Sequence, residues 1–170
     1  CALPIFYPLG GASAEEPRDY LTRDQFVESH AQTAVLKAVM DLVGGDGKKF
    51  DAIELYSCFP CVPKMARRTL GLGADVQPTV TGGLTFFGAP LNTYMTHSAC
   101  AMVRKLRNGG TLGLLYGQGG FVTQHRSLVL GAGGGVGRMV LQIAAVHGFA
   151  AVGVASAAKR ELIEETGAAF

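Results

Sequence analysis

Residues Thr79–Tyr94 read TVTGGLTFFGAPLNTY and lead into a run with helical spacing. The adjacent glycines Gly82 and Gly83 and the later Gly88 permit positive φ angles, so they predict a sharply bent backbone. Pro90 favours the first turn of a following helix, and apolar residues then recur every three to four positions. Such a glycine loop can present amide donors to an anion or a carbonyl oxygen. A purely structural turn is the alternative.

The patterns on both sides of this loop predict an α/β protein. Residues 8–19 contain Gly, Ala and Pro and predict an irregular arm, so that residues 1–19 precede the folded region. A capping box at Thr22–Gln25 predicts that a helix begins there and ends at Gly44. Further strands are expected at 50–56, 111–116 and 127–130. A second helix is expected to begin within residues 57–63 and to end at residue 70, and a third is expected at 91–106.

Composition narrows the class of protein. Of 170 residues, 48% are hydrophobic and 24 are glycines, which fits an α/β protein with many strand–helix turns. A mean hydropathy of +0.26 is high for so small a domain and indicates apolar faces meant for absent partners. A net charge of +2 with mixed signs, and the lack of Trp, predict no nucleic-acid interface. No metal site is expected.

The cysteines and the apolar segments indicate a cytoplasmic, reduced protein. Four cysteines occur with no visible signal peptide. The most apolar window, Met139–Ala158, contains Gln142 and His147 and follows a glycine turn, so a membrane span is rejected. Residues 1–5 lack a Met and resemble a translated sequencing adapter, which predicts that they are not native.

Three segments resemble, in order, the carboxyl-terminal part of the thiolase superfamily over about residues 17–130. The glycine loop resembles the family's Asn-x-Asn-Gly-Gly-x-x-x-x-Gly-His-Pro-Leu motif. Residues 51–59, DAIELYSCF, resemble the strand and loop that carry Asn-Glu-Ala-Phe or His-Asp-Cys-Phe. Residues 113–120, GLLYGQGG, resemble the strand and loop that hold Cys-x-Gly. The resemblance implies a coenzyme A thioester as substrate, a possible homodimer, and a substrate loop formed by Gly82, Gly83, Gly88 and Pro90.

The resemblance also implies that the catalytic set is incomplete. Ala89 stands where the family has its activating histidine, and Tyr56 stands at the Asn or His position. The second cysteine would fall at Tyr116 or Gly117, and the half of the family that carries the nucleophilic cysteine is missing. Claisen chemistry needs a thiolate, a base and an oxyanion site together. The chain therefore resembles the acyltransferase branch usually labelled acetyl-CoA acetyltransferase, and we expect no thiolase activity from it.

Three other side chains near these motifs suggest rival chemistry. Cys58 and Cys61 follow a strand and begin a helix, where a redox dithiol would lie because the helix dipole lowers a thiol pKa. The alternative is the family-type Cys-Phe with an incidental second cysteine. His97 could replace the lost base, but it lies about two helical turns beyond Pro90, so a structural role is preferred.

A second signature begins after the strand predicted at 127–130. Residues 131–137 read GAGGGVG and are followed by a helical and then a strand pattern, which is the order of a dinucleotide-binding βαβ unit. This segment resembles the NADP-binding start of medium-chain dehydrogenase/reductases, close to the quinone-oxidoreductase branch. The turn positions that the resemblance assigns to the pyrophosphate are Ala132, Gly134, Gly135, Val136 and Gly137. A glycine turn without a nucleotide is the alternative.

The end of the next predicted strand favours NADP(H) over NAD. No Asp or Glu stands there to bind a ribose 2′-hydroxyl, whereas Ser156, Lys159 and Arg160 suit a 2′-phosphate. The chain stops before the remaining strands and the catalytic domain of such reductases. A reductase fragment is therefore expected to lack hydride transfer.

Together these patterns predict two partial units. A partial thiolase-type half-domain over residues 20–126 is followed by a truncated Rossmann-type βαβ unit over 127–170, joined near 127–130 as a chimera of two coding segments. The preferred function is that of a thiolase-like acyl-CoA acyltransferase fragment without thiolase activity. The alternatives are an NADPH-dependent medium-chain reductase fragment and a redox dithiol protein.

Overall fold

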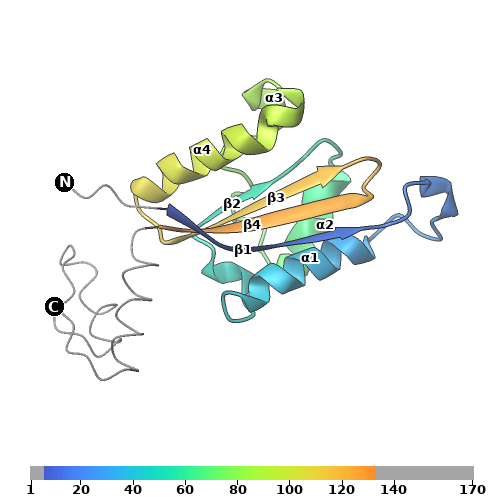
Figure 1. Ribbon diagram of the computed structural model, residues 1–170, viewed down its shortest axis with the longest axis horizontal. Coiled ribbons are helices and arrows are strands. Elements are labelled where there is room, and N and C mark those ends of the chain that lie inside the picture. The colour runs from blue at the N-terminus through green and yellow to red at the C-terminus, as the bar shows by residue number, and fades with distance from the viewer. Residues whose placement is uncertain (1–5, 133–170) are drawn as a thin grey trace. The chain divides into compact units, whose positions relative to one another are not determined.

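A computed structural model describes residues 6–132, which form one mixed sheet with helices on both faces (Figure 1). The strands are β1 (Phe6–Glu15), β2 (Ala52–Leu55), β3 (Leu112–Gly119) and β4 (Gln124–Ala132). Their order in the sheet is β1-β4-β3-β2. β2 runs parallel to β3, with Leu55 opposite Tyr116, and β4 runs antiparallel to β3, with Ser127 opposite Tyr116.

The helical elements lie in the connections between strands. The α-helices are α1 (His30–Asp41), α2 (Cys61–Leu70), α3 (Leu84–Phe87) and α4 (Tyr94–Arg107). Short 3-10 turns are η1 (Tyr20–Thr22), η2 (Gly47–Lys49) and η3 (Leu91–Thr93). The parallel pair β2 and β3 requires a long crossover, and α2, the glycine loop and α4 supply it.

The two faces of the sheet have different covers. Successive residues of a strand point to opposite faces, so β3 contributes to both layers. Leu114 and Tyr116 belong to the main core beneath α1 and α2. On the other face, a Cβ at Gly113 would lie 2.5 Å from Sδ of Met102, so glycine is required for α4 to pack this closely.

The main core is formed by side chains of α1, α2 and the strands β2, β3 and β4, with Phe50 and Val122 from the connections. Its members are Val35, Leu36, Val39, Phe50, Ile53, Leu55, Val62, Met65, Ala66, Leu70, Leu114, Tyr116, Val122 and Val129. The apolar residues of α1 and α2 recur at helical spacing, which explains why both segments fold as helices against one sheet face.

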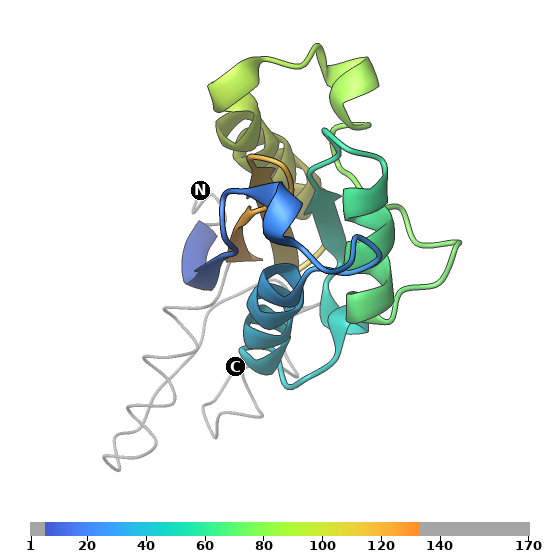
Figure 2. The ribbon, with the colours of Figure 1, turned by 90° about the vertical axis from the view of Figure 1, so that its right-hand side faces the viewer.

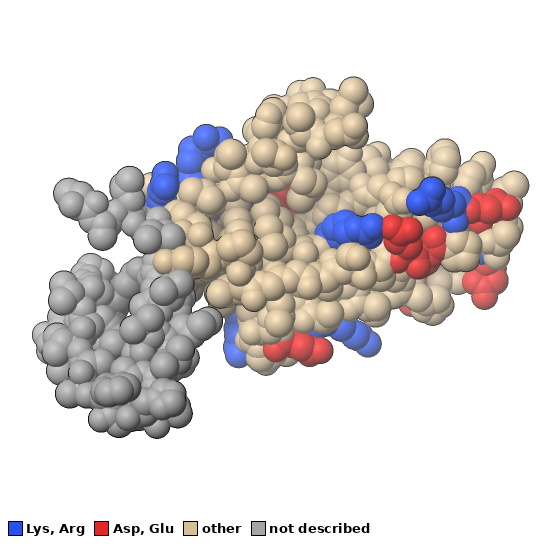
Figure 3. Space-filling view, in the orientation of Figure 1, with Lys and Arg blue, Asp and Glu red and all other residues tan. Residues whose placement is uncertain are grey.

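Charged side chains are sparse on the face shown in Figure 3. Blue side chains gather near one end of α4, whose last turn contains Arg104, Lys105 and Arg107. At the sheet edge, Arg126 of β4 pairs with Glu15 of β1 at 2.5 Å. The side seen in the figure therefore carries both signs of charge and no continuous basic stripe.

The structure corrects the prediction of an irregular amino-terminal arm. Residues 6–15 form β1, an edge strand beside β4, with alternating exposure along its second half. A Cβ at Gly11 would lie 2.5 Å from the carbonyl oxygen of Ser127, so a glycine that suggested an irregular arm permits close pairing of the two strands. Long-range pairing has overridden local composition here.

The predicted helix start at Thr22–Gln25 is also wrong. The Thr22 hydroxyl donates to the carbonyl oxygen of Asp19, and Gln25 Oε1 accepts from the amides of Val27 and Glu28. Both side chains thus serve local turns. The helix begins at His30, where the preceding Ser29 hydroxyl accepts from a backbone amide of the first turn.

The other predicted elements within the described residues are confirmed. The strands at 50–56 and 111–116 correspond to β2 and β3, and the helices ending at 70 and 106 correspond to α2 and α4. Gly71 ends α2 in the left-handed conformation with φ 67°, as expected for a glycine stop. The segment predicted at 127–130 lies inside β4, whose register with β3 continues to Gly131. The βαβ unit predicted beyond it lies outside the described residues.

Substitution of Leu36 tests how α1 packs on the sheet. Leu36 is fully buried, whereas Leu42 at the end of the same helix is 54% exposed. We expect Leu36→Ala to lower the free energy of unfolding by about 2–5 kcal/mol, because it leaves a cavity, and Leu42→Ala to lower it by less than about 1 kcal/mol. Urea denaturation followed by circular dichroism measures both. Equal losses of unfolding free energy in the two variants would contradict the burial of Leu36 in this core.

Candidate functional site

Three loops meet at the edge of the sheet where the parallel strands β2 and β3 end. Figure 2 faces this edge, which is surrounded by α3, η1 and the segment before α2. The amide of Tyr56 donates to the carbonyl oxygen of Tyr116 at 3.0 Å and holds the end of β2 on β3. The Cys58 thiol donates to Oε1 of Gln118 at 2.7 Å. A Cβ at Gly83 would lie 3.2 Å from the Ser57 hydroxyl. The three motif segments predicted from the sequence are therefore neighbours in space.

The carboxylate of Glu54 holds the glycine loop on β2. Glu54 is completely buried on the strand that precedes the site. Its Oε2 accepts from the Thr79 hydroxyl at 2.8 Å and from the amides of Val80 and Thr81 at 2.8 and 3.1 Å. Its Oε1 accepts from the Thr81 hydroxyl at 2.9 Å and from the Tyr94 hydroxyl at 2.6 Å. One side chain thus joins β2, the start of the loop and the start of α4.

The glycine loop is strained as well as bent. Gly82, Gly83 and Gly88 have φ angles of 90°, 82° and 80°, which confirms the predicted positive φ angles. Ala89 and Leu91 also have positive φ angles, 45° and 49°. Non-glycine residues rarely adopt this conformation, so the loop keeps its shape only because its surroundings hold it.

The amides of the adjacent glycines are already used within the loop. The amide of Gly82 donates to the Thr79 hydroxyl at 3.0 Å, and that of Gly83 donates to the Thr81 hydroxyl at 3.2 Å. These two donors are therefore not free for an anion, which favours the structural role of this part of the loop. What the glycines provide at the edge is space without side chains.

Aromatic rings line the space between the loop and α4. The ring of Tyr94 lies 5.1 Å from that of Tyr56 and 5.6 Å from that of Phe87, in edge-to-face arrangements. His97 lies one turn along α4, with its ring 5.9 Å from that of Phe87. Burial, followed by the bond to Glu54, raises the pKa of Tyr94 to about 12, and burial raises the pKa of Tyr56. Both hydroxyls therefore stay protonated at neutral pH.

The residues at the predicted catalytic positions do not all face the same part of the structure. Tyr56 lies at the meeting point of the loops, and Ala89 lies exposed in the strained part of the glycine loop. Tyr116 points to the sheet face that α1 and α2 cover, where its hydroxyl accepts from Nε2 of Gln32 at 2.8 Å. Of the two candidates for the second cysteine position, only Gly117 faces α4, since a Cβ there would lie 3.2 Å from Cγ of Met95. Neither Ala89 nor Gly117 carries a group that can transfer a proton.

Cys58 lacks the electrostatics of a redox thiol. Burial raises its pKa, with a smaller contribution in the same direction from Cys61. A reactive dithiol requires a lowered pKa, so this direction runs against the redox interpretation. Cys61 is exposed at the first residue of α2, while Cys58 is half-buried against Gln118.

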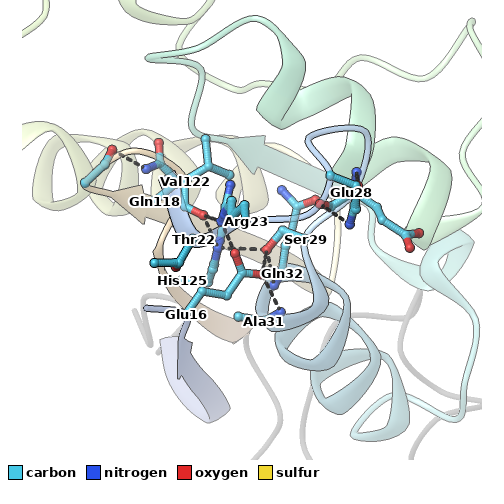
Figure 4. A network of polar contacts seen from close by, with 12 residues as sticks. Glu16, Thr22, Arg23, Glu28, Ser29, Ala31, Gln32, Gln118, Val122 and His125 are labelled. Atoms are coloured by element: carbon cyan, nitrogen blue, oxygen red, sulfur yellow. Dashed lines mark hydrogen bonds and ion pairs between the residues drawn. The ribbon is translucent and has the colours of Figure 1, made fainter. Parts of the chain in front are cut away.

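A buried polar chain lies beneath α1, on the sheet face that α1 and α2 cover (Figure 4). Gln32 Nε2 donates to the Tyr116 hydroxyl, whose own proton faces Nδ1 of His125 at 2.7 Å. The remaining ring nitrogen, Nε2, lies 3.1 Å from the Ser29 hydroxyl. Ser29 in turn donates to Oε1 of Glu16 at 2.6 Å. Neutral His125 with its proton on Nε2 satisfies every partner in this chain.

Sequence reasoning assigned no role to either polar cluster. Glu54 stands in a strand whose four residues are all buried, and a lone charged residue at such a position is the signal that it must have partners. No sequence motif identified above includes His125. Its partners Glu16 and Ser29 are distant in sequence, so no spacing pattern could connect them.

Arg23 closes the polar chain at the surface. Its guanidinium pairs with Oε2 of Glu16 and donates to the carbonyl oxygen of Val122. The second oxygen of Glu16 also accepts from the amide of Ala31 at 3.1 Å, so the carboxylate lies at the start of α1. Glu16 therefore ties β1, η1 and α1 to the turn before β4.

Other kinds of site receive no support within residues 6–132. No three acidic, His or Cys side chains there are placed to hold a metal ion. None of the helices described is both long and apolar enough to cross a bilayer. The predicted nucleotide-binding residues from Gly134 to Arg160 lie outside the described part of the chain, and Ala132 is the last residue of β4.

The fold is similar to that of a solved thiolase-like protein. The structure of a monomeric SCP2-thiolase like protein type 1 from Mycobacterium smegmatis matches with a TM-score of 0.67 at 28% sequence identity. The match covers 74% of this chain and 28% of that protein. No family model and no curated protein matches the chain.

The described residues form part of a thiolase-type fold. The mixed four-stranded sheet with its helices matches a fragment of that fold, as the resemblance of the three motif segments predicts. Because the chain spans 28% of the length of the similar protein, this likeness concerns one part of the fold.

Glu54 provides the first test of the site. In Glu54→Gln an amide NH₂ replaces one oxygen, so buried donors of the loop lose their acceptor. We expect the free energy of unfolding to fall by about 1–3 kcal/mol, and the amides of Val80 and Thr81 to exchange hydrogen faster. Glu15→Gln, at the exposed Arg126 pair, is the control and leaves both quantities nearly unchanged. Unchanged exchange in Glu54→Gln would contradict this role.

His125 provides a test through pH. Burial, with Arg23 and Arg126 nearby, lowers the pKa of His125 to about 4, so the folded state favours the neutral ring. The stability contributed by the neutral ring is present above pH 6.5 and is lost as pH falls toward 4, by up to about 3 kcal/mol. We expect His125→Gln to lose most of the stability change between pH 6.5 and 5, measured by urea denaturation. An equally steep change in the variant would assign it to other groups.

Proposed function

We propose that the chain is part of a thiolase-type protein and contributes the edge at which an acyl-CoA thioester binds. The meeting of the three motif segments at one edge of a thiolase-type sheet carries this proposal. In the family that the chain resembles, these segments surround the thioester. Gly82 and Gly88 are exposed and carry no side chain, so a thioester can lie against this part of the loop.

The side chains at this edge suit binding better than Claisen chemistry. Tyr56 stays protonated and can donate a hydrogen bond to a carbonyl oxygen, but it cannot act as a base at neutral pH. The Cys58 thiol is held by Gln118 and has a raised pKa. Ala89 and Gly117 supply no proton donor or acceptor. The described residues are therefore proposed to bind the substrate without turning it over.

The other functions predicted from the sequence have no observation in their favour from residues 6–132. NADP(H) binding depends on the segment from Gly134 to Arg160 and stays a prediction. The cytoplasmic setting and the possible homodimer also stay predictions.

Gly88 and Gly71 form a matched pair for testing acyl-CoA binding. Both are exposed and left-handed, with φ 80° and ψ 11° at Gly88 and φ 67° and ψ 27° at Gly71, so alanine strains the two backbones to a similar degree. A Cβ has nothing within 4 Å at either position, but only Gly88 belongs to the glycine loop of the proposed site. We expect acetyl-CoA to bind the full chain, and Gly88→Ala to weaken binding about tenfold while Gly71→Ala changes it less than twofold. Isothermal titration calorimetry measures all three.

A parallel assay separates binding from catalysis. We expect no thiolysis of acetoacetyl-CoA by the purified chain, since the positions at Ala89 and Gly117 have no titratable group. Failure of acetyl-CoA to bind at millimolar concentration would contradict the proposed function, and turnover would contradict its restriction to binding.

A further inference from the structure

A pocket of about 330 Å³ lies between α1, α2 and the loop that precedes α1. The two helices lie side by side on one face of the sheet (Figure 1). α1 contributes Thr33 and Lys37 to the lining, and α2 contributes Arg68. None of the lining residues belongs to the glycine loop or to the segments around Tyr56 and Gln118, so the pocket is distinct from the proposed thioester edge.

Two positive charges border the pocket, one from each helix. Lys37 and Arg68 are both exposed. No ion pair within residues 6–132 includes either of them. Cations that line a concave surface without a carboxylate partner raise the local concentration of anions.

The loop before α1 holds the guanidinium of Arg68 in place. Nη2 of Arg68 donates to the carbonyl oxygen of Val27 at 2.9 Å, across 41 positions of sequence. This bond uses one of the five N–H donors of the side chain, so the others can donate to the oxygens of a ligand. The planar fork of a guanidinium matches two oxygens of a phosphate or a carboxylate.

The hydroxyl of Thr33 adds an uncharged donor beside Lys37. The two residues are four positions apart in α1 and are therefore neighbours on one side of the helix. The Thr33 hydroxyl forms no hydrogen bond with another residue within 6–132. In contrast, the Thr69 hydroxyl already donates to the carbonyl oxygen of Met65 at 3.3 Å. Thr33 is therefore the hydroxyl that can donate to a ligand.

One carboxylate, that of Glu28, lines the same pocket. No ion pair joins it to Lys37 or Arg68, so two cations and one carboxylate leave an excess of one positive charge. This excess favours an anion, and Glu28 opposes its binding. A phosphate monoester fits the two cations because it carries almost two negative charges at neutral pH and three acceptor oxygens.

The pocket also offers a surface to the organic part of such a ligand. Val27, whose side chain is 70% exposed, lies on the loop before α1, and Met65 lies on α2. Both are apolar and line the same pocket as the cations. Its volume exceeds that of a phosphate ion, so an attached carbon group has room beside them.

We infer that the pocket between α1 and α2 binds the phosphate group of a small phosphorylated molecule. Lys37 provides a point charge, Arg68 provides a fork of N–H donors, and Thr33 provides a hydroxyl donor. This inference goes beyond the proposed function and does not depend on it. Inorganic phosphate has the same acceptor chemistry, so the experiment compares the two sources.

NMR titration of the ¹⁵N-labelled full chain with inorganic phosphate and with glycerol 3-phosphate, at constant ionic strength, tests the inference. We expect the backbone amide signals of Thr33, Lys37 and Arg68 to shift together, with a Kd for glycerol 3-phosphate of about 1 mM. Inorganic phosphate should bind about threefold more weakly, because it lacks the carbon group.

Substitutions of exposed side chains locate the site while the fold survives. Lys37→Gln and Arg68→Gln should each weaken glycerol 3-phosphate binding about fivefold or more, whereas Glu28→Gln should strengthen it about twofold, because it removes the opposing charge. Lys105→Gln removes an exposed charge from the last turn of α4, on the other sheet face, and is the matched control. It should change binding less than twofold.

Every other result contradicts a defined part of the inference. An absence of saturable shifts at about 20 mM of either probe would overturn the site. Binding that persists in Lys37→Gln and Arg68→Gln would overturn its location, and equal weakening in Lys105→Gln would show a response to net charge alone and overturn it too. Equal affinity for the two probes would overturn the phosphorylated molecule and identify inorganic phosphate as the ligand.

Discussion

The buried carboxylate of Glu54 determines how the glycine loop lies on the sheet. A carboxylate without exposure to water requires compensation, and five donors from the loop and α4 provide it. This arrangement fixes Thr79–Thr81 against β2 and the Tyr94 hydroxyl at the start of α4. The strained conformation at Ala89 lies between these two attachments, so the fixed ends help to hold it.

The fixed loop explains what the edge can do. Because Gly82 and Gly83 donate to hydroxyls of the same loop, they act by leaving space and not by binding an anion. Ser57 and Cys58 after β2, and Gln118 in β3, complete this edge. At Ala89 and Gly117 the chain has no titratable side chain.

Elements with local signals could be predicted from the sequence. Apolar spacing gave β2, α2, α4 and β3, and Gly71 correctly marked a helix end. β1 was not predicted, because its pairing with β4 depends on residues more than a hundred positions away. The first helix was started too early, since the Thr22 hydroxyl serves a turn at Asp19. Patterns of hydroxyl and amide residues do not distinguish a helix cap from a local turn.

The site was predicted as a set of segments but not as a set of contacts. The ordered resemblance placed the three loops together, which the contact of Cys58 with Gln118 supports. It could not reveal that the Tyr116 hydroxyl bonds to Gln32 and His125 in the core, since that depends on which face of β3 each residue occupies. The partners of Glu54 were also hidden, because they lie about 25 and 40 residues further along the chain.

Mapping acetyl-CoA by NMR on the ¹⁵N-labelled chain tests the central claim most directly. The account predicts that the backbone amide signals of Ser57, Gly83 and Gln118 shift together and saturate at one ligand concentration, because all three residues border one edge. Signals that stay unchanged at these positions, or shifts confined to residues remote from that edge, would contradict it.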